Sequence, residues 1–309
     1  MVPINNYFSL DERVKIALEK KQAVVALETT VITHGLPYPE NIDLAREIEN
    51  TISSEGATPA TIGVIQGKVR VGLNQIEIQE LATYPQAEKV SLRDFSKLVV
   101  RQGWGGTTVA GTMWAAHQVG IQVFSTGGIG GVHRSTSKHF IFDVSTDLLA
   151  LAQIPLIVVC SGAKSILNLE ATLELLETLA VPVVGYQTDS FPAFYTKESG
   201  GLKTNVTAAN AEDVTQFAKA HWGLGFKSGL LVTVPPPDGQ SLQYDEVEKY
   251  IEIAIQEAET KQIRGQAVTP FLLDRLNDLS QGKSLQANLA LLLNNARIAA
   301  QIAKYMCVV

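Results

Sequence analysis

Short apolar runs alternate with longer amphipathic stretches along most of the chain. Runs rich in β-branched residues and bounded by glycine, proline or polar residues predict buried strands, and they occupy Ala23–Leu27, Ile121–Ser125, Leu156–Cys160, Pro182–Gln187 and Gly229–Val234. Two further runs, Thr61–Gln66 and Val69–Leu73, predict a hairpin that turns at Gly67 and Lys68. Residues 97–101 also predict a strand.

Stretches in which apolar residues recur every third or fourth position predict helices. They cover residues 11–21, 37–53, 75–83, 163–178, 244–262, 270–280 and 284–305, and the glycine-rich segment 103–108 leads into another helix that ends near Val119. Residues 196–228 are polar and irregular, and predict an excursion with one short helix. Strands that alternate with helices in this way predict a single α/β/α layered domain over residues 1–309, with a mainly parallel or mixed central sheet.

Two of the predicted strands end in small, glycine-rich turns that carry reactive residues. Ile121–Ser125 leads into residues 126–134, which include His133, and Leu156–Cys160 leads into residues 161–165, which include Lys164. Residues 142–147, between them, carry two aspartates. Ligands of open parallel sheets bind beyond the carboxyl ends of the strands. We therefore expect these groups to meet at one edge of the sheet and to form an active site.

Composition and charge argue against several classes of protein. A chain of 309 residues, 46% of them hydrophobic, can bury a full core, and its net charge of −6 gives no support for a nucleic-acid surface. With only two cysteines, a disulfide framework is not expected and a reducing compartment is favoured. The N-terminus lacks the order of a secretory signal, and no apolar run reaches the ~18 residues that a membrane span needs. We expect a soluble, cytoplasmic protein with no nucleic-acid or membrane partner.

Lys164 and Glu28 are the candidates for covalent and acid–base chemistry. Lys164 lies at the start of a predicted helix, where the helix dipole disfavours a cation and lowers the pKa of an amine nucleophile; a solvated lysine at a helix end is the common alternative. A phosphate-binding loop is rejected because Ile157 occupies the place of its first glycine. Glu28 ends the first strand and is either an acid or base of raised pKa or a cap for the next turn. The nearby His34 is either a site residue or structural.

Asp143 and Asp147 could hold a cation. In an extended segment they and Ser145 would share one face and offer oxygens to Mg²⁺ or Mn²⁺, with water and ligand completing the shell. The alternative is that Ser145 or Asp147 caps a helix. Residues 127–131 do not match the dinucleotide fingerprint, but their N–H groups, like those of residues 107–109, could bind a phosphate. Either turn could also be a tight turn without a ligand.

Six segments follow one another in the order of a known family. They are Ala26–Gly35, Thr107–Met113, Ser125–Arg134, Val159–Ser165, Val184–Thr188 and Thr269–Leu273, and they span nearly the whole chain. With them the chain resembles the pseudouridine-5′-phosphate glycosidases, also called pseudouridylate synthases and related to indigoidine synthase A. The resemblance implies an indigoidine synthase A-like fold and the reversible cleavage of the C–C glycosidic bond of pseudouridine 5′-phosphate, which gives uracil and ribose 5-phosphate.

The resemblance also implies roles for individual residues. Lys164 matches the nucleophile that forms an imine with C1′ of the ring-opened sugar, Glu28 matches the proton donor, and Asp143 matches the ligand of a metal, implied to be Mn²⁺. The implied substrate-binding residues are Lys89, Val109, Ser145, Thr146 and Asp147. The family is typically homotrimeric, and residues 133–143 form a longer segment than is usual in it.

The implied chemistry fits these residue types. An aryl carbon is a poor leaving group, so an iminium at C1′ supplies an electron sink that two carboxylates alone would not, and C5 of uracil must then be protonated. Two other functions are compatible with the sequence. One is a Schiff-base lyase or aldolase that acts on another sugar phosphate, and the other is a non-catalytic sensor of a sugar phosphate or nucleotide.

Overall fold

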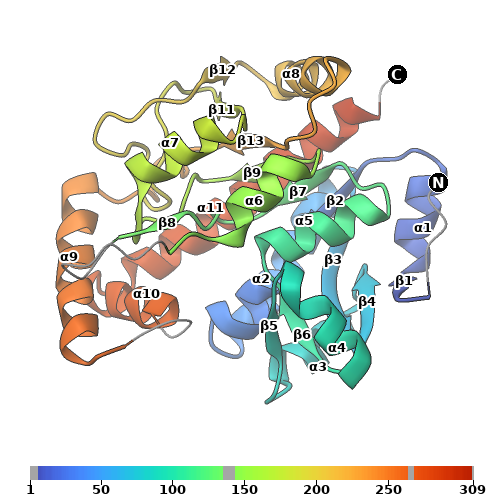
Figure 1. The fold of residues 1–309 in the computed structure, drawn as a ribbon, viewed down its shortest axis with the longest axis horizontal. Helices are drawn as coiled ribbons and strands as arrows, with labels where there is room; N and C mark the ends of the chain where they lie inside the picture. The colour runs from blue at the N-terminus through green and yellow to red at the C-terminus, as the bar shows by residue number, and fades with distance from the viewer. Residues whose placement is uncertain (1–5, 135–142, 264–267, 308–309) are drawn as a thin grey trace.

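A mixed β-sheet runs through the molecule. In the computed structural model, which describes residues 6–134, 143–263 and 268–307, eleven strands form this sheet. Nine of them follow the order β1-β4-β3-β2-β7-β9-β13-β11-β12, and β6 joins at β3 and pairs with β5 (Figure 1). Their bounds are β1 Phe8–Leu10, β2 Val24–Leu27, β3 Thr58–Ile65, β4 Lys68–Val71, β5 Glu88–Val90, β6 Gly105–Thr107, β7 Val123–Ser125, β9 Ile157–Cys160, β11 Val183–Tyr186, β12 Val206–Ala208 and β13 Leu230–Thr233.

The centre of the sheet is parallel and the side around β3 is mixed. β2 pairs in parallel with β3 and β7, and β9 pairs in parallel with β7 and β13. β3 pairs antiparallel with β4 and β6. In register, Leu27 faces Ser125, and Ser125 faces Val159. The carboxyl ends of β2, β7 and β9 are therefore level, and the predicted fold class is confirmed.

Helices cover both faces of the sheet. On one side α11 (Lys283–Met306) packs against α2 (Glu40–Ser54), α8 (Ala211–Gly223) and strands β2, β7 and β9. On the other side α5 (Val109–Gln118), α6 (Thr146–Gln153) and α7 (Leu169–Thr178) lie in a row, with α11 crossing behind them in Figure 1. α9 (Tyr244–Thr260) packs on α10 (Val268–Leu279) at one end of the molecule. The other α-helices of the described residues are α1 (Glu12–Glu19), α3 (Gln75–Thr83) and α4 (Phe95–Arg101), and η1 (Val31–Gly35) and η2 (Leu92–Asp94) are a short π-helix and a short 3₁₀-helix.

The core has the composition of a sheet covered on both faces. Every residue of β2, β9, β11 and β13 is buried, as expected for central strands that have helices on both sides. α2 buries the stripe of Ile42, Ala45, Ile48 and Ile52 against the sheet and α11. Within the described ranges, none of the helices combines the length and the apolar character that a membrane crossing requires. Cys160 and Cys307 are both free thiols.

Two of the local predictions in this part of the chain were wrong. Residues 97–101 belong to helix α4 rather than to a strand, because Phe95 and Leu98 bury one helical face while Val100 is 81% exposed. The glycine-rich segment 103–108 leads into α5 as predicted, and it also contains strand β6. The hairpin turns one residue earlier than predicted, at Gln66 and Gly67, and both have positive φ.

Candidate active site

Three adjacent parallel strands deliver the central side chains of the site. Glu28 follows β2, Thr126 follows β7, and the turn that carries Lys164 follows β9. Because these strands are neighbours in register, their carboxyl ends lie at one edge of the sheet, where ligands of such sheets bind. The structure therefore brings Glu28, Thr126 and Lys164 together at this edge of the sheet.

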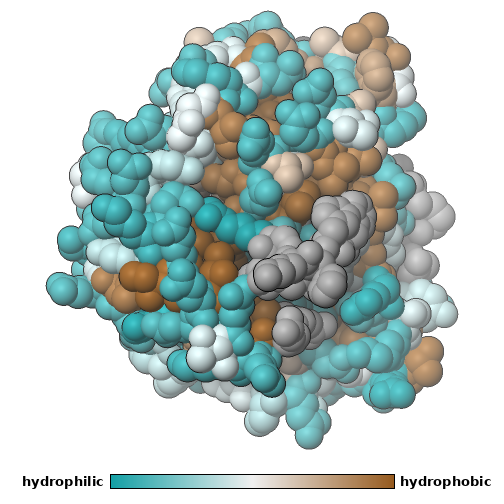
Figure 2. Space-filling view, turned by 60° about the vertical axis from the view of Figure 1, so that its left-hand side comes forward, coloured by the Kyte–Doolittle hydropathy of each residue, from teal (hydrophilic) through white to brown (hydrophobic). Residues whose placement is uncertain are grey.

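A two-lobed cavity opens at this edge of the sheet. The larger lobe has a volume of about 530 Å³ and includes His34, Phe194, Leu273, Asn288 and Leu292 in its wall. The smaller lobe has a volume of about 330 Å³, and all the site residues implied by the resemblance border it: Glu28, Lys89, Val109, Asp143, Ser145, Thr146, Asp147 and Lys164. Glu28, Lys89 and Lys164 border both lobes. Figure 2 shows a hollow near the middle of one face, with polar and apolar side chains at its walls.

Glu28 is an acid whose surroundings favour the neutral form. Burial raises the pKa of its carboxyl, and the negative charge of Asp147 acts in the same direction. The positive charges of Lys164 and Lys89 and a short hydrogen bond from the Thr126 hydroxyl to Oε1 oppose this effect without cancelling it. A carboxyl of raised pKa next to a cavity is suited to general acid–base catalysis.

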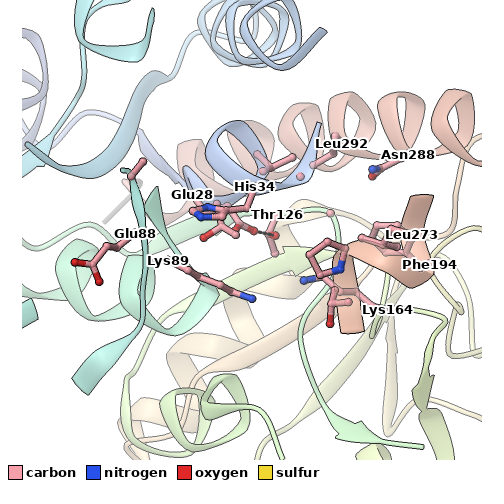
Figure 3. A pocket seen from close by; sticks show the side chains of 18 of the residues that line it. Glu28, His34, Glu88, Lys89, Thr126, Lys164, Phe194, Leu273, Asn288 and Leu292 are labelled. Atoms are coloured by element: carbon pink, nitrogen blue, oxygen red, sulfur yellow. Dashed lines mark hydrogen bonds between the residues drawn. The ribbon is translucent and has the colours of Figure 1, made fainter. Parts of the chain in front are cut away.

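Two lysines reach the cavity from different elements. Lys89 lies on β5, and Figure 3 shows its ammonium and that of Lys164 pointing into the same space. Burial, and then the charge of Lys164, lower the pKa of Lys89. Burial and the charge of Lys89 lower the pKa of His34, whose Nδ1 lies 2.6 Å from Thr33 Oγ1. The cavity therefore places two basic side chains close to Glu28.

Lys164 does not lie at a helix N-terminus. The residues after it form a turn and strand β10 (Leu167–Asn168), which pairs with β8 (Val132–His133), and α7 begins only at Leu169. The predicted helix start at residue 163 was wrong, because Asn168 provides the cap by accepting the N–H of Ala171. The argument that a helix dipole makes Lys164 a nucleophile therefore does not apply. Its backbone N–H instead donates to Ile129 O at 3.1 Å, which fixes it against the glycine-rich turn.

The segment 143–147 is extended only as far as Ser145, because α6 begins at Thr146 and includes Asp147. Ser145 caps α6 by accepting the N–H of Asp147 at 3.2 Å, so the capping alternative is correct. The buried Asp147 carboxylate accepts the N–H of Ala110 at 3.0 Å and that of Gly130 at 2.8 Å. It thereby joins the first turn of α5 to the glycine-rich turn. Asp143, in contrast, is exposed at the smaller lobe.

Three N–H groups of the glycine-rich turn 126–134 are hydrogen-bonded to other parts of the protein. The N–H groups at Ile129, Gly130 and Val132 donate to Gly162 O, the Asp147 carboxylate and the Thr172 hydroxyl. A Cβ at Gly130 would lie 2.3 Å from Ser145 Oγ, so only glycine fits there. The phosphate interpretation was therefore wrong for these three N–H groups. At the start of α5, the Val109 N–H has no hydrogen-bond acceptor within the described ranges.

The donor groups at the smaller lobe allow only an open metal site. Within the described part of the chain, no three histidine, cysteine or acidic side chains are grouped to hold an ion. Both Asp147 oxygens already accept backbone N–H groups, which leaves Asp143 as the exposed carboxylate. One protein carboxylate fits a hard cation that takes its other ligands from water and substrate.

Several wall residues were not identified from the sequence. Thr126 lies within the segment Ser125–Arg134, but only the structure reveals its hydrogen bond to Glu28. Phe194 lies in the connection between β11 and β12, and Asn288 and Leu292 lie on α11; no local pattern in the sequence marks them. Cys160, at the end of β9, is excluded as a nucleophile because burial raises its pKa to about 12.

The chain has relatives over its full length. Residues 13–305 match the family described as indigoidine synthase A like protein. The chain is 48% identical to the pseudouridine-5′-phosphate glycosidase of Caldanaerobacter subterraneus subsp. tengcongensis over 300 residues, which are 97% of each chain. It is 46% identical to the protein of the same name from Geobacillus kaustophilus over 301 residues, 97% of this chain and 99% of that one.

Two solved structures have the same fold. The prealnumycin C-glycosynthase AlnA, in complex with ribulose 5-phosphate, has a TM-score of 0.90 and 35% identity, with 98% of each chain covered. An indigoidine synthase A-like protein from Thermotoga maritima has a TM-score of 0.89 and 34% identity, with 99% of each chain covered. The chain therefore belongs to the indigoidine synthase A-like family of pseudouridine-5′-phosphate glycosidases.

Proposed function

We propose that this protein cleaves pseudouridine 5′-phosphate reversibly to uracil and ribose 5-phosphate. The observation that carries the proposal is the meeting of the half-buried acid Glu28 with Lys164 and Lys89 between the two lobes of one cavity. Relatives at 48% and 46% identity bear the name of this activity. A more distant relative is named as a C-glycosynthase and binds a pentulose 5-phosphate, which supports a sugar phosphate joined to carbon as the substrate class.

The two lobes suit the two halves of this substrate. The larger lobe offers the apolar side chains of Phe194, Leu273 and Leu292 together with the amide of Asn288, as a planar, hydrogen-bonding base requires. The smaller lobe offers the hydroxyls of Ser145 and Thr146 and the start of α5, which suit a sugar phosphate. We assign uracil to the larger lobe and ribose phosphate to the smaller one. The C1′–C5 bond then lies between them, beside Glu28 and Lys164.

Lys164 and Glu28 divide the chemistry between them. The unprotonated Nζ of Lys164 bonds to C1′ while the C1′–O4′ bond breaks, and Glu28 gives its proton to O4′. The proton that the Lys164 nitrogen loses on bonding to C1′ returns Glu28 to its acid form, and Glu28 then protonates uracil C5. The C1′–C5 bond breaks, and the nitrogen lone pair forms the imine at C1′. Water hydrolyses this imine and releases ribose 5-phosphate and the lysine. Lys89, whose pKa is lowered by burial and by Lys164, stands beside the same bond.

Asp143 is the residue that would hold Mn²⁺, with water and substrate oxygens as the other ligands. When bound, the ion would neutralise negative charge on the substrate. We also propose that the protein works as a homotrimer in the cytoplasm. Light scattering of the purified protein tests its oligomeric state, and fractionation of the source cells tests its location.

A uracil-release assay on pseudouridine 5′-phosphate tests the proposed reaction. We expect equal amounts of uracil and ribose 5-phosphate, and the reverse reaction when both are supplied. Turnover of plain sugar phosphates without C-nucleotide cleavage would instead favour a Schiff-base lyase or aldolase, and tight binding without turnover would favour a sensor. Glu49→Gln is a matched control, since Glu49 is a buried glutamate outside both lobes. It should keep the activity that Glu28→Gln loses.

A further inference from the structure

A buried asparagine on the last long helix contacts the two turns that carry the reactive groups. Asn295 lies in α11, is 0% exposed and borders neither lobe of the cavity. Its Nδ2 donates to Thr126 O at 2.9 Å and lies 3.2 Å from Ser161 Oγ. Its neighbours along the helix, including Leu291 and Ala296, are buried and apolar. An amide at such a position is costly to bury unless it is hydrogen-bonded.

These contacts connect Asn295 to both sides of the reaction centre. Thr126 donates its hydroxyl to Glu28, so the backbone oxygen and the hydroxyl of one residue link Asn295 to the acid. Ser161 begins the turn that carries Lys164, and its N–H donates to Gly127 O at 2.8 Å. The two turns are therefore fastened to each other and, through Asn295, to α11.

We propose that Asn295 is a positioning residue, which holds the Thr126 hydroxyl on Glu28 and fixes the Thr126 turn against the turn of Lys164. The effect of Asn295 on kcat rests on the proposed function, whereas its effect on the titration of Glu28 does not. The charged groups that face Glu28 are Lys164, Asp147 and Lys89, and they belong to other elements than α11. A substitution of Asn295 that adds no charge therefore acts on the pKa of Glu28 through the position of Thr126.

Asn295→Leu removes the donor, keeps the branched shape of the side chain and adds no charge. Because the Thr126 hydroxyl favours the ionised form of Glu28, its displacement should move the titration of Glu28 to higher pH. That titration can be followed by NMR of ¹³C-labelled glutamate carboxyls, with Glu28→Gln identifying the resonance. In the uracil-release assay, misplacement of the acid should lower kcat by about 10–100-fold. KM should change much less, because Asn295 touches neither lobe.

A double-mutant cycle separates positioning from a purely structural role. Thr126→Val alone should raise the titration of Glu28, and Asn295→Leu should add no further shift in that background. Ser161→Ala is the matched control, because it removes a hydroxyl contact of Asn295 but leaves the bond to Thr126 O. It should leave Glu28 close to its wild-type titration. If Asn295→Leu does not fold, Asn295→Ala removes the same donor with less bulk.

Two results would overturn the proposal. One is a folded Asn295 variant in which Glu28 titrates as in the wild type, and the other is a shift that persists in full after Thr126→Val. If the wild-type protein releases no uracil, the proposed function fails, but the NMR titration still tests the role of Asn295. The two failures are therefore distinguishable.

Discussion

The guanidinium of Arg134 forms a two-point ion pair with the carboxylate of Glu248, with both N–O distances at 2.8 Å. The same guanidinium donates to Ser165 O and to Leu167 O, each at 3.0 Å. Arg134 follows β8, Glu248 lies on α9, and the two carbonyls belong to the short segment that follows Lys164. The planar guanidinium of Arg134 thus connects the segment that follows Lys164 to helix α9, which comes from a distant part of the sequence.

Glu248→Gln should weaken this tie. Because hydrogen bonds to charged groups contribute about 1.5–3 kcal/mol, we expect the free energy of unfolding in urea to fall by about 2 kcal/mol. Arg134→Lys should lower it too, since an ammonium cannot reproduce the fork. Asp189→Asn is the matched control, as its pair with Lys203 is exposed and should contribute little. Equal effects of Glu248→Gln and Asp189→Asn would contradict the argument.

Removal of the metal should suppress turnover. Asp143 is an exposed carboxylate at the smaller lobe, so chelation should lower the rate of uracil release and Mn²⁺ should restore it. Asp143→Ala should abolish this restoration and weaken Mn²⁺ binding measured by EPR, while the fold is kept. Asp43→Ala, an exposed carboxylate on α2, should change neither. Full turnover by the metal-stripped protein, or unfolding of Asp143→Ala, would refute this role of Asp143.

The parts of the site that are local in sequence could be predicted. β2, β7 and β9 are buried on both faces, so their sequences are continuous apolar runs, and Glu28 and Lys164 follow from where those runs end. Residues 163–168 were misread because their small and apolar residues continue the pattern of α7. The cap that begins the helix, Asn168, is visible in the sequence.

The long-range parts of the site could not be predicted. Asn295 and Thr126 are hydrogen-bonded across 169 positions of the chain, and only the packing of α11 on the sheet brings them together. The same holds for Asn288 at the larger lobe. The Val99–Val100 pair favoured a strand, but the burial of Phe95 and Leu98 overrides that preference. Tertiary packing decides such cases.

Lys164 should be the residue that carries the sugar. Borohydride reduces an imine to a stable amine, so treatment of the protein with ribose 5-phosphate and borohydride should add one reduced sugar phosphate to the peptide that contains Lys164. Lys164→Ala should give no adduct and almost no turnover, and Lys164→Arg should fail as well because a guanidinium stays protonated. Mass spectrometry of the digested protein locates the adduct. A label on Lys89, which borders the same cavity, would assign the nucleophile to that residue instead.

Glu28→Gln should stabilise the protein at neutral pH while it disables the reaction. Burial raises the pKa of Glu28 above its ordinary value of 4.5, so the folded state holds a proton that the unfolded chain releases once the pH exceeds 4.5. Folded wild-type protein therefore loses stability as the pH rises from 4.5 to the raised pKa, and the cost persists above it. Glutamine has no proton to release, so the variant escapes this cost. Its kcat should nevertheless fall by about 10²–10⁴-fold, the usual contribution of general acid–base catalysis.

Glu49→Gln provides the comparison that separates stability from catalysis. Burial also raises the pKa of Glu49, which accepts hydrogen bonds from Thr61 and Gln75 away from the cavity. Urea unfolding at pH 7 should therefore show a gain in stability for both variants, and at a pH below 4.5 both gains should vanish because wild-type carboxyls are then protonated in both states. Only Glu28→Gln should lose uracil release. A Glu28→Gln protein that is less stable than the wild type at pH 7 would mean that Lys164 and Lys89 outweigh burial, and near-normal turnover would leave Glu28 a structural residue.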